Sequence, residues 1–290
     1  DEDYVKSLLE FSVKVGKALT DYYVEAGMDV ISFVDPLVSQ ISPNHFEAFL
    51  SGPYSELFDY CREKEVFSSF FVCGDATKNI EVMCRTRPNC ISVDENVDIA
   101  KAKEITDKYN IVIAGNIQLT ITMLHGSQQD NMKAVIDIID SCGTQNLIIS
   151  PGCDMPYDCP VENVIACAQA VNDYENTKKA LENYVGQDFS DIEINIPDYH
   201  NLSRPLVEVF TLDSATCAAC SYMMNVSNEV KAENQELFDL KEYKFTIKEN
   251  IARCMKQGVK HLPSLYINGE LKWSSIIPSK KELLDEIMKY

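Results

Sequence analysis

Short apolar runs alternate with amphipathic stretches over residues 1 to 175. The runs are rich in β-branched and aromatic residues, and Gly, Pro, Asp or Asn bounds them: Val30 to Val34, Ser69 to Cys73, Cys90 to Val93, Ile111 to Ala114 and Leu147 to Ser150. Apolar runs separated by helical patterns are typical of parallel strands joined by crossover helices. This region therefore predicts an α/β fold with five β/α units, preceded by a helix over Asp3 to Met28.

Polar residues stand at the end of each predicted strand. The ends read Val34-Asp35-Pro36, Cys73-Gly74-Asp75, Val93-Asp94-Glu95, Gly115-Asn116 and Ser150-Pro151-Gly152-Cys153-Asp154. In a β/α barrel the carboxyl ends of the strands carry the active site, so these five ends predict one functional rim. A full barrel has about eight such units. We therefore expect a partial TIM-type barrel that a missing N-terminal portion or a partner chain completes.

A second domain is expected after an acidic stretch with Asn and Pro residues. That stretch, residues 184–204, has little apolar period and is typical of a linker between domain 1–183 and domain 205–290. The order that follows is strand, helix, strand, helix, hairpin and helix: Leu206 to Leu212, Cys217 to Lys231, Leu240 to Phe245, Ile247 to Gln257, Leu265 to Ile267 with Leu271 to Trp273, and Lys280 to Met288. Asn268-Gly269 is the hairpin signal.

Composition narrows the classes of partner. The 290-residue chain has 45 Asp and Glu against 26 Lys and Arg, a formal net charge of −19, which disfavours nucleic acid and anionic membranes. No segment approaches the roughly 18 uninterrupted apolar residues of a membrane helix. The chain opens Asp1-Glu2-Asp3 without a Met or a basic leader, which indicates a partial chain rather than a secreted precursor. Eleven scattered Cys favour reduced thiols in the cytoplasm.

A Cys-x-x-Cys motif lies where the first strand of the second domain turns into a helix. The amino end of a helix stabilises a thiolate, so Cys217 is predicted as the attacking thiol and Cys220 as the resolving one. Half of a structural zinc site is the alternative, although the domain holds no second such pair.

The second domain resembles the thioredoxin-like family. The resemblance rests on this motif, the Asn-Gly hairpin and His261-Leu262-Pro263-Ser264, and it implies a cis peptide at Pro263 beside the two thiols. Ala218-Ala219 differs from the family's Gly-Pro-containing turn. The redox potential and the choice of partner therefore depend on the residues around the sulfurs.

Two further cysteines lie on the predicted rim. Cys73 and Cys153 are candidate zinc ligands, and Asp94 or Glu95 could add a carboxylate. A zinc ion with an open position would bind a substrate thiol and deprotonate it. The alternative is that both cysteines are core residues, the usual role of a lone Cys in an apolar strand.

The first domain resembles the uroporphyrinogen decarboxylase superfamily, and within it the corrinoid-dependent methyltransferases. The motifs are Ile41-Ser42-Pro43, Val72 to Asp75, Ile91 to Asp94, Ala114 to Asn116, and Ser150 to Asp154 with Pro156, Pro160, Glu162 and Asn163 after it. The resemblance implies methyl transfer from methylcobalamin on a corrinoid protein to a small thiol, with zinc bound by Cys73 and Cys153. We expect Asp35 and Asn116 to contribute to cofactor binding.

The family's zinc-binding His is replaced by Phe71, which cannot bind a metal. His45 and His125 lie in rim-like loops, where each either replaces that nitrogen or is a solvated or capping side chain. Three functions follow. The first is methyl transfer with a fused redox domain. The second is a thiol–disulfide oxidoreductase whose barrel is a docking module, and the third is a decarboxylase acting on a tetrapyrrole.

Overall fold

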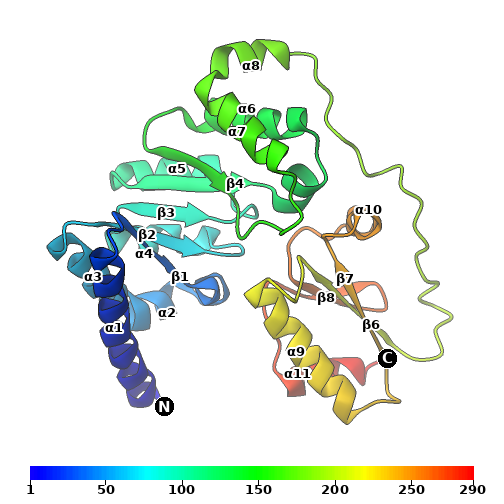
Figure 1. The fold of residues 1–290 in the computed structure, drawn as a ribbon. Helices are drawn as coiled ribbons and strands as arrows, with labels where there is room; N and C mark the ends of the chain where they lie inside the picture. Colours follow the sequence, from blue (N-terminus) through cyan, green and yellow to red (C-terminus); the bar gives the residue numbers. More distant parts are fainter. The chain divides into compact units, whose positions relative to one another are not determined.

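Five parallel strands form one sheet in the computed structural model, which describes residues 1–290. The sheet order is β1-β2-β3-β4-β5 (Figure 1), with bounds β1 Val30–Val34, β2 Phe67–Val72, β3 Cys90–Val93, β4 Val112–Ile117 and β5 Leu147–Pro151. Every neighbouring pair is parallel, so all five carboxyl ends meet at one edge. The predicted α/β architecture with five β/α strands is confirmed.

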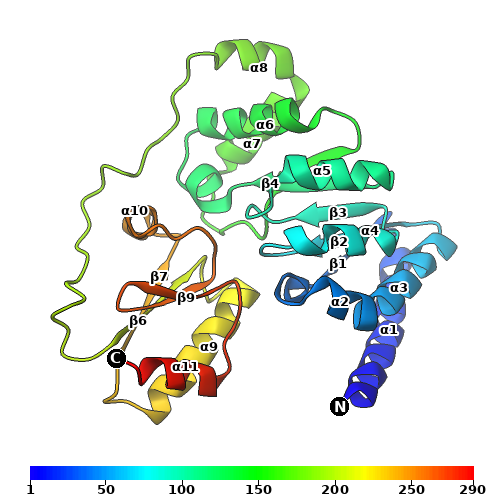
Figure 2. The ribbon, with the colours of Figure 1, turned by 180° about the vertical axis from the view of Figure 1, so that it is seen from behind.

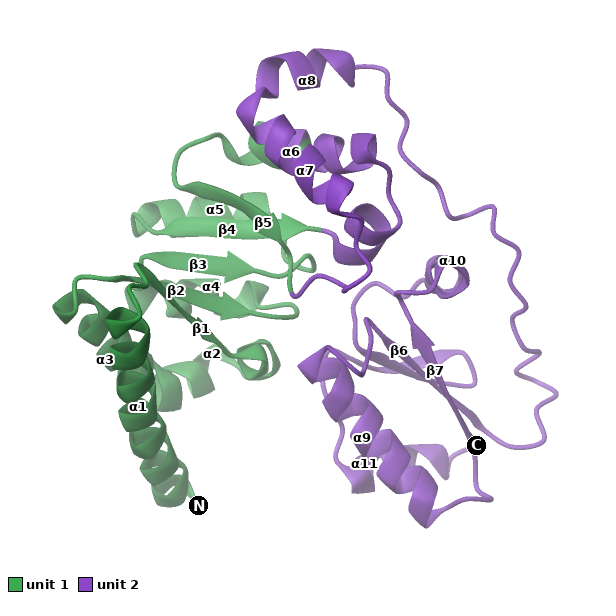
Figure 3. Ribbon diagram, in the orientation of Figure 1, with its two compact units in different colours: residues 1–117, 137–153 green, residues 118–136, 154–290 purple.

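The chain divides into two compact units. One comprises residues 1–117 and 137–153, and the other residues 118–136 and 154–290 (Figure 3). The five-stranded sheet belongs to the first unit. No helix has the length and apolar character needed to cross a membrane.

One helix, α1, precedes the first strand and further helices follow the strands, as the sequence pattern predicts. The α-helices up to residue 180 are α1 Glu2–Glu25, α2 Pro43–His45, α3 Ser51–Glu63, α4 Ile80–Arg85, α5 Ile99–Lys108, α6 Gln128–Cys142, α7 Val161–Asn172 and α8 Tyr174–Ala180. Single turns of 3₁₀ helix cover Pro36–Gln40 and Thr77–Asn79, and π turns cover Phe46–Leu50 and Leu119–Leu124.

Helix α1 begins at a capped end and packs against α3. The Asp1 carboxylate accepts from the amides of Asp3 and Tyr4, which satisfies two of the free donors of the first turn. Lys17 pairs with Glu56 at 2.8 Å, and α1 and α3 lie side by side in both views (Figures 1 and 2). The other face of α1 is apolar and exposed, with residues Tyr4, Val5, Leu8, Phe11, Val15, Leu19, Tyr22 and Tyr23.

Aromatic side chains fill the space between α3 and β2. The rings of Tyr54 and Phe70 have centroids 4.2 Å apart, and Phe58 and Phe46 lie within 6.2 Å of Phe70. Phe46, Phe58 and Phe70 are fully buried. Buried aromatic pairs contribute both apolar burial and ring contacts, so this cluster anchors α3 on the sheet.

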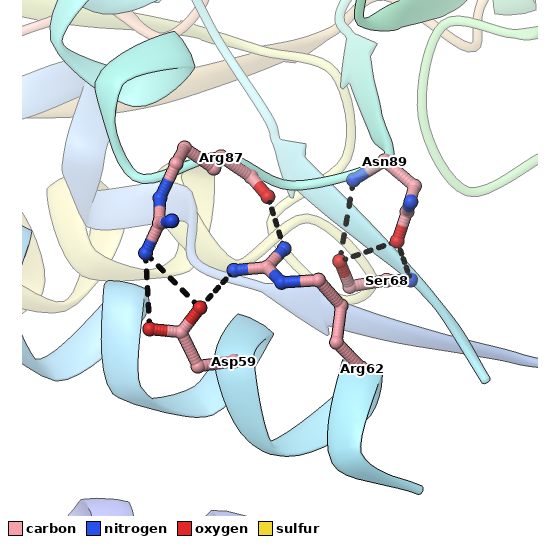
Figure 4. A network of polar contacts seen from close by, with 5 residues as sticks. All are labelled: Asp59, Arg62, Ser68, Arg87 and Asn89. Atoms are coloured by element: carbon pink, nitrogen blue, oxygen red, sulfur yellow. Dashed lines mark hydrogen bonds and ion pairs between the residues drawn. The ribbon is translucent and has the colours of Figure 1, made fainter. Parts of the chain in front are cut away.

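A polar network fixes the amino ends of β2 and β3 (Figure 4). Asp59 of α3 accepts from Arg87 at 3.0 Å and also pairs with Arg62, which donates to the carbonyl of Arg87 at 2.7 Å. The Asn89 side chain accepts from the Ser68 amide at 2.9 Å, and the Asn89 amide donates to the Ser68 hydroxyl at 3.2 Å. The loop that enters β3 is thus tied both to α3 and to β2, which fixes their register.

A four-stranded mixed sheet lies in the second unit. Its order is β7-β6-β8-β9, with bounds β6 Leu206–Thr211, β7 Asp239–Lys244, β8 Ser264–Ile267 and β9 Glu270–Ser274. β6 pairs parallel with β7 and antiparallel with β8. The helices are α9 Ala218–Glu233, α10 Lys248–Gln257 and α11 Lys280–Ile287. The predicted order of strands, helices and hairpin is confirmed.

Successive side chains of β6 point to opposite faces of this sheet, and helices cover both faces. Val207 and Val209 join the core formed with α9 and α11, which lie next to each other in Figures 1 and 2. Phe210 points to the opposite face, where it packs with Cys254 of α10. Successive strand residues face opposite sides of a sheet, so both faces of β6 are covered.

A buried ion pair lies on the α10 side of β6. Glu208 is fully buried and pairs with Arg253, which is 4% exposed. The hydroxyl of Tyr199 donates to Glu208 at 2.8 Å, and Arg253 also donates to the carbonyl of Asn195 at 2.9 Å. Residues 184–204 contain no helix or strand, but these contacts fasten the end of that segment to the domain.

Glu208→Ala is expected to lower the free energy of unfolding by about 3–5 kcal/mol, because it leaves the buried Arg253 charge without its partner. Urea unfolding of the full chain measures this change. The matched control is Lys280→Ala, which removes an exposed pair with Glu229 and should cost about 0–1 kcal/mol. Equal losses in the two variants would contradict the role of the buried pair.

Candidate functional site

Two of the predicted rim residues meet at the carboxyl edge of the five-stranded sheet. The sulfur atoms of Cys73 and Cys153 lie 2.7 Å apart, and both residues are half-buried. Cys73 directly follows β2, and Cys153 follows β5, although two strands separate β2 from β5 in the sheet. The loops after the strands therefore bring together two thiols that are 80 residues apart in the sequence.

The turn after β3 holds the loop that carries Cys73. One carboxylate oxygen of Asp94 accepts from the Gly74 amide at 2.9 Å, and the other accepts from the Asn96 amide at 2.9 Å. Asp94 is only 6% exposed, and this burial raises the pKa of its carboxyl, although the amides of Gly74 and Asn96 act to lower it. Asp94 thus fixes the backbone directly after Cys73.

The same turn also supports the loop that carries Cys153. A Cβ atom on Gly152 would lie 2.6 Å from the backbone nitrogen of Glu95, so only glycine fits against this turn. The Asn116 side chain donates to the carbonyls of Asp94 at 3.0 Å and Val97 at 2.7 Å. Residues 94–97, called here the Asp94 turn, therefore position both thiol loops.

The structure does not show a zinc site among the residues at this edge. Two thiolates on tetrahedral zinc, with bonds of about 2.3 Å, would hold their sulfurs about 3.8 Å apart, whereas these lie 2.7 Å apart. No group of three or more His, Cys, Asp or Glu side chains that could hold a metal ion is present. Asp94 instead binds backbone amides, and Phe71 lies within β2. Zinc on Cys73, Cys153, Asp94 and Glu95 stays a prediction, and we assign no step to it.

Asp35 and Asn116 make structural hydrogen bonds at the ends of β1 and β4. The Asp35 carboxylate accepts from the Leu37 amide at 3.0 Å and from the Tyr54 hydroxyl at 2.7 Å, so it caps the 3₁₀ turn that follows. Asn116 holds the Asp94 turn. A role of either residue in cofactor binding stays a prediction.

Asn79 is a positioning residue that the sequence analysis missed. It is fully buried, and its side-chain amide donates to the carbonyls of Val38 at 2.6 Å and Ile41 at 3.0 Å. These bonds hold the loop after β1, which carries Ile41-Ser42-Pro43. An Asn directly before the apolar start of a predicted helix, Ile80 to Met83, is the sequence signal that could have identified it.

In the second unit, the Cys-x-x-Cys motif has one reachable and one buried sulfur. Cys217 is half-buried and is the N-cap residue of α9, so the free amides of the first helical turn lie next to it. Cys220 is fully buried, and its sulfur accepts from the Leu212 amide at 3.2 Å. The hydrogen bond with Cys217, together with burial, raises the pKa of Cys220 well above its usual range. Cys217 is therefore the better candidate for the attacking thiol.

Pro263 lies at the same end of this sheet as the two cysteines. The peptide bond between Leu262 and Pro263 is cis, as the family resemblance implies. β8 begins at the next residue, Ser264, which pairs with Phe210 near the carboxyl end of β6. The Cys217 turn follows that end of β6, so the antiparallel register places the proline at the edge where the motif lies.

This geometry defines an α/β protein with two pairs of thiols, one at the carboxyl edge of each sheet. Residues 1–174 match the family model described as uroporphyrinogen decarboxylase (URO-D), and residues 206–289 match the one described as thioredoxin domain. The first match covers more than half of the chain. The chain therefore belongs to the uroporphyrinogen decarboxylase family and carries a thioredoxin-like domain.

Its relatives include methyltransferases and decarboxylases. The methylcobamide:CoM methyltransferase MtbA of Methanosarcina acetivorans is 28% identical over 176 residues, covering 60% of this chain and 50% of the relative. MtbA of Methanosarcina mazei is 29% identical over 175 residues, with the same coverage. A uroporphyrinogen decarboxylase of Picrophilus torridus is 26% identical and covers 56% of this chain and 45% of the relative. The chain spans about half the length of the curated relatives that it matches.

One solved structure supports the fold of the first domain. A methyltransferase from Methanosarcina mazei superposes with a TM-score of 0.55 at 23% sequence identity, covering 60% of this chain and 51% of that chain. The match shows that the five-stranded β/α segment has the fold of part of that protein.

Gly152→Ala should destabilise the chain by about 1–3 kcal/mol, because the added methyl group overpacks against the backbone of Glu95. Urea unfolding measures the loss. Gly52→Ala is the matched control, since a Cβ there meets nothing within 4 Å and alanine favours the helix in which Gly52 lies. If both variants were as stable as the parent chain, the contact between Gly152 and the Asp94 turn would be wrong.

Limited alkylation of the reduced native chain should modify Cys217 before Cys220, because Cys220 is buried and its pKa is raised. Iodoacetamide followed by peptide mass spectrometry measures the order. In urea both cysteines should react, which serves as the control. Modification of Cys220 at the rate of Cys217 in the native chain would reverse the assignment of attacking and resolving thiols.

Proposed function

We propose that the first domain takes part in methyl transfer from a methylated corrinoid, carried by a partner protein, to a small thiol. The observation that carries the proposal is the convergence of Cys73 and Cys153 at the carboxyl edge of the sheet. These two cysteines match the positions at which the resemblance to corrinoid-dependent methyltransferases implies functional thiols. The names of the relatives, methylcobamide:CoM methyltransferases, support a corrinoid substrate and suggest coenzyme M as an acceptor to test.

The chemistry requires an acceptor thiol that has lost its proton. Its sulfur attacks the methyl carbon, so the carbon–sulfur bond forms while the carbon–cobalt bond of the substrate breaks. The electron pair of the broken bond stays on cobalt, and the proton of the acceptor thiol goes to solvent. The chain's contribution would be orientation: the Cys73 and Cys153 side chains would position the acceptor, and the Asp94 turn fixes the backbone beside both of them.

The thioredoxin-like domain would keep thiols reduced. The Cys217 thiolate attacks a target disulfide and forms a mixed disulfide, and the Cys220 sulfur then displaces the second target thiol. The target gains two electrons, and Cys217 and Cys220 become a disulfide. Thiols and low-valent cobalt are both easily oxidised, so a dithiol on the same chain acts at a high effective concentration.

A thiol–disulfide oxidoreductase with a non-catalytic barrel is the second candidate. The observation in its favour is that Cys217 caps α9 while the buried Cys220 sulfur accepts from the Leu212 amide, a pattern that suits an attacking and a resolving thiol, whereas the structure does not show a metal site at Cys73. In this case the first domain would only bind a partner.

We also propose that further β/α units, from the same protein or from a partner chain, cover the first domain. β1 is an edge strand, and Val30 and Val34 are more than half exposed. The exposed apolar face of α1 includes Tyr4, Phe11 and Tyr22. Large apolar side chains gathered on one helix face are typical of a surface that another part of a protein covers.

Methyl transfer is tested with the full chain, methylcobalamin and 2-mercaptoethanesulfonate (coenzyme M), with the methyl thioether measured by mass spectrometry. Cys73→Ser and Cys153→Ser are each expected to lower the rate by roughly a hundredfold, the scale of losing a positioned group. Cys142→Ser, a half-buried cysteine of α6, is the control and should keep the rate.

The double variant Cys217→Ser with Cys220→Ser separates the two candidates. Under the methyl-transfer proposal it keeps methyl transfer in the presence of dithiothreitol and loses reduction of protein disulfides. If the parent chain reduced disulfides but formed no thioether with any thiol, the second candidate would replace the first.

A further inference from the structure

The sulfur atoms of Cys73 and Cys153 are close enough to form a disulfide after a small movement. Their sulfurs lie 2.7 Å apart, in contact but without a covalent bond. A disulfide needs about 2.05 Å, so the two atoms would have to approach by only about 0.7 Å.

We propose that Cys73 and Cys153 form a reversible disulfide at the carboxyl edge of the β/α sheet, by exchange with a small disulfide such as glutathione disulfide. The inference does not depend on methyl transfer, since it concerns only the chemistry of the two sulfurs. In the oxidised form neither sulfur is available to a metal or a substrate, so oxidation would switch the site off.

The exchange balances in two steps. One cysteine thiolate attacks glutathione disulfide, which forms a mixed disulfide and releases one glutathione. The second cysteine thiolate then attacks the sulfur of the first cysteine and releases the second glutathione. The cysteine pair loses two electrons, glutathione disulfide gains them, and the two protons of the cysteine thiols are taken up by the released glutathione thiolates or by solvent.

The other cysteines outside the Cys-x-x-Cys motif are poorly suited to this chemistry. Five are buried: Cys61, Cys84, Cys90, Cys167 and Cys254. Burial raises their pKa values to about 11 or 12, which keeps them as unreactive thiols. Cys142 and Cys159 are half-buried, but no contact joins either of them to another cysteine sulfur.

The Asp94 turn explains why the pair stays together in the reduced state. Asp94 holds the Gly74 amide, next to Cys73, and Glu95 packs against Gly152, next to Cys153. The residues next to both cysteines therefore contact the same turn, and a disulfide would form without rearranging the sheet. Because both residues are half-buried rather than fully buried, a small disulfide can reach them.

The test uses the full chain carrying Cys217→Ser and Cys220→Ser, so that the motif of the second domain does not contribute. The reduced chain is freed of reductant, incubated with glutathione disulfide, quenched with N-ethylmaleimide and mapped by mass spectrometry. We expect one species that is lighter by two hydrogens, with the peptides of Cys73 and Cys153 linked. Dithiothreitol should reverse the link.

Single replacements distinguish this pair from chance oxidation. Adding Cys73→Ser or Cys153→Ser should abolish the link and leave one glutathione on the remaining cysteine, whereas Cys142→Ser or Cys159→Ser should leave the link unchanged. The proposal is overturned if Cys73 and Cys153 stay unmodified, or if each retains its own glutathione. Each readout is a mass, so failure of methyl transfer would leave the result intact.

Discussion

The candidate site depends on the hydrogen bond that the buried carboxylate of Asp94 accepts from the Gly74 amide. Parallel pairing places five strand ends at one edge, but pairing alone does not bring β2 and β5 together, because two strands lie between them. The turn after β3 contacts both loops. Asp94 accepts a hydrogen bond from the Gly74 amide in the loop after β2, and Glu95 packs against Gly152 in the loop after β5. Without this turn the loops that carry the two thiols would have no common support.

The fold could be predicted from the sequence, because it depends on local patterns. The apolar run Val30 to Val34 forms β1 as predicted. β2 begins two residues earlier than predicted, at Phe67, whose side chain is exposed. Cys73 and Cys153 were identified from their places after strands. The role of Asp94 was not, because a side chain that binds the backbone of a distant loop leaves no periodic signal. A zinc ligand and a loop-supporting carboxylate look the same in sequence.

Two pairs of cysteines lie in different settings in this chain. In the thioredoxin-like domain the amino end of α9 and the buried Cys220 make the two sulfurs unequal, which favours a directed exchange from Cys217. At the edge of the β/α sheet the sulfurs of Cys73 and Cys153 come from separate loops, and both residues are half-buried.

The most direct test of the account is whether Cys73 and Cys153 act as one dithiol in the reduced native chain. Phenylarsine oxide binds two thiols only when they lie close together, so its stoichiometry is measured on the full chain with Cys217→Ser and Cys220→Ser. The account predicts one arsenic bound per chain, and none after Cys73→Ser is added. A chain that binds no arsenic, or that binds it equally well without Cys73, would contradict the convergence of the two thiols.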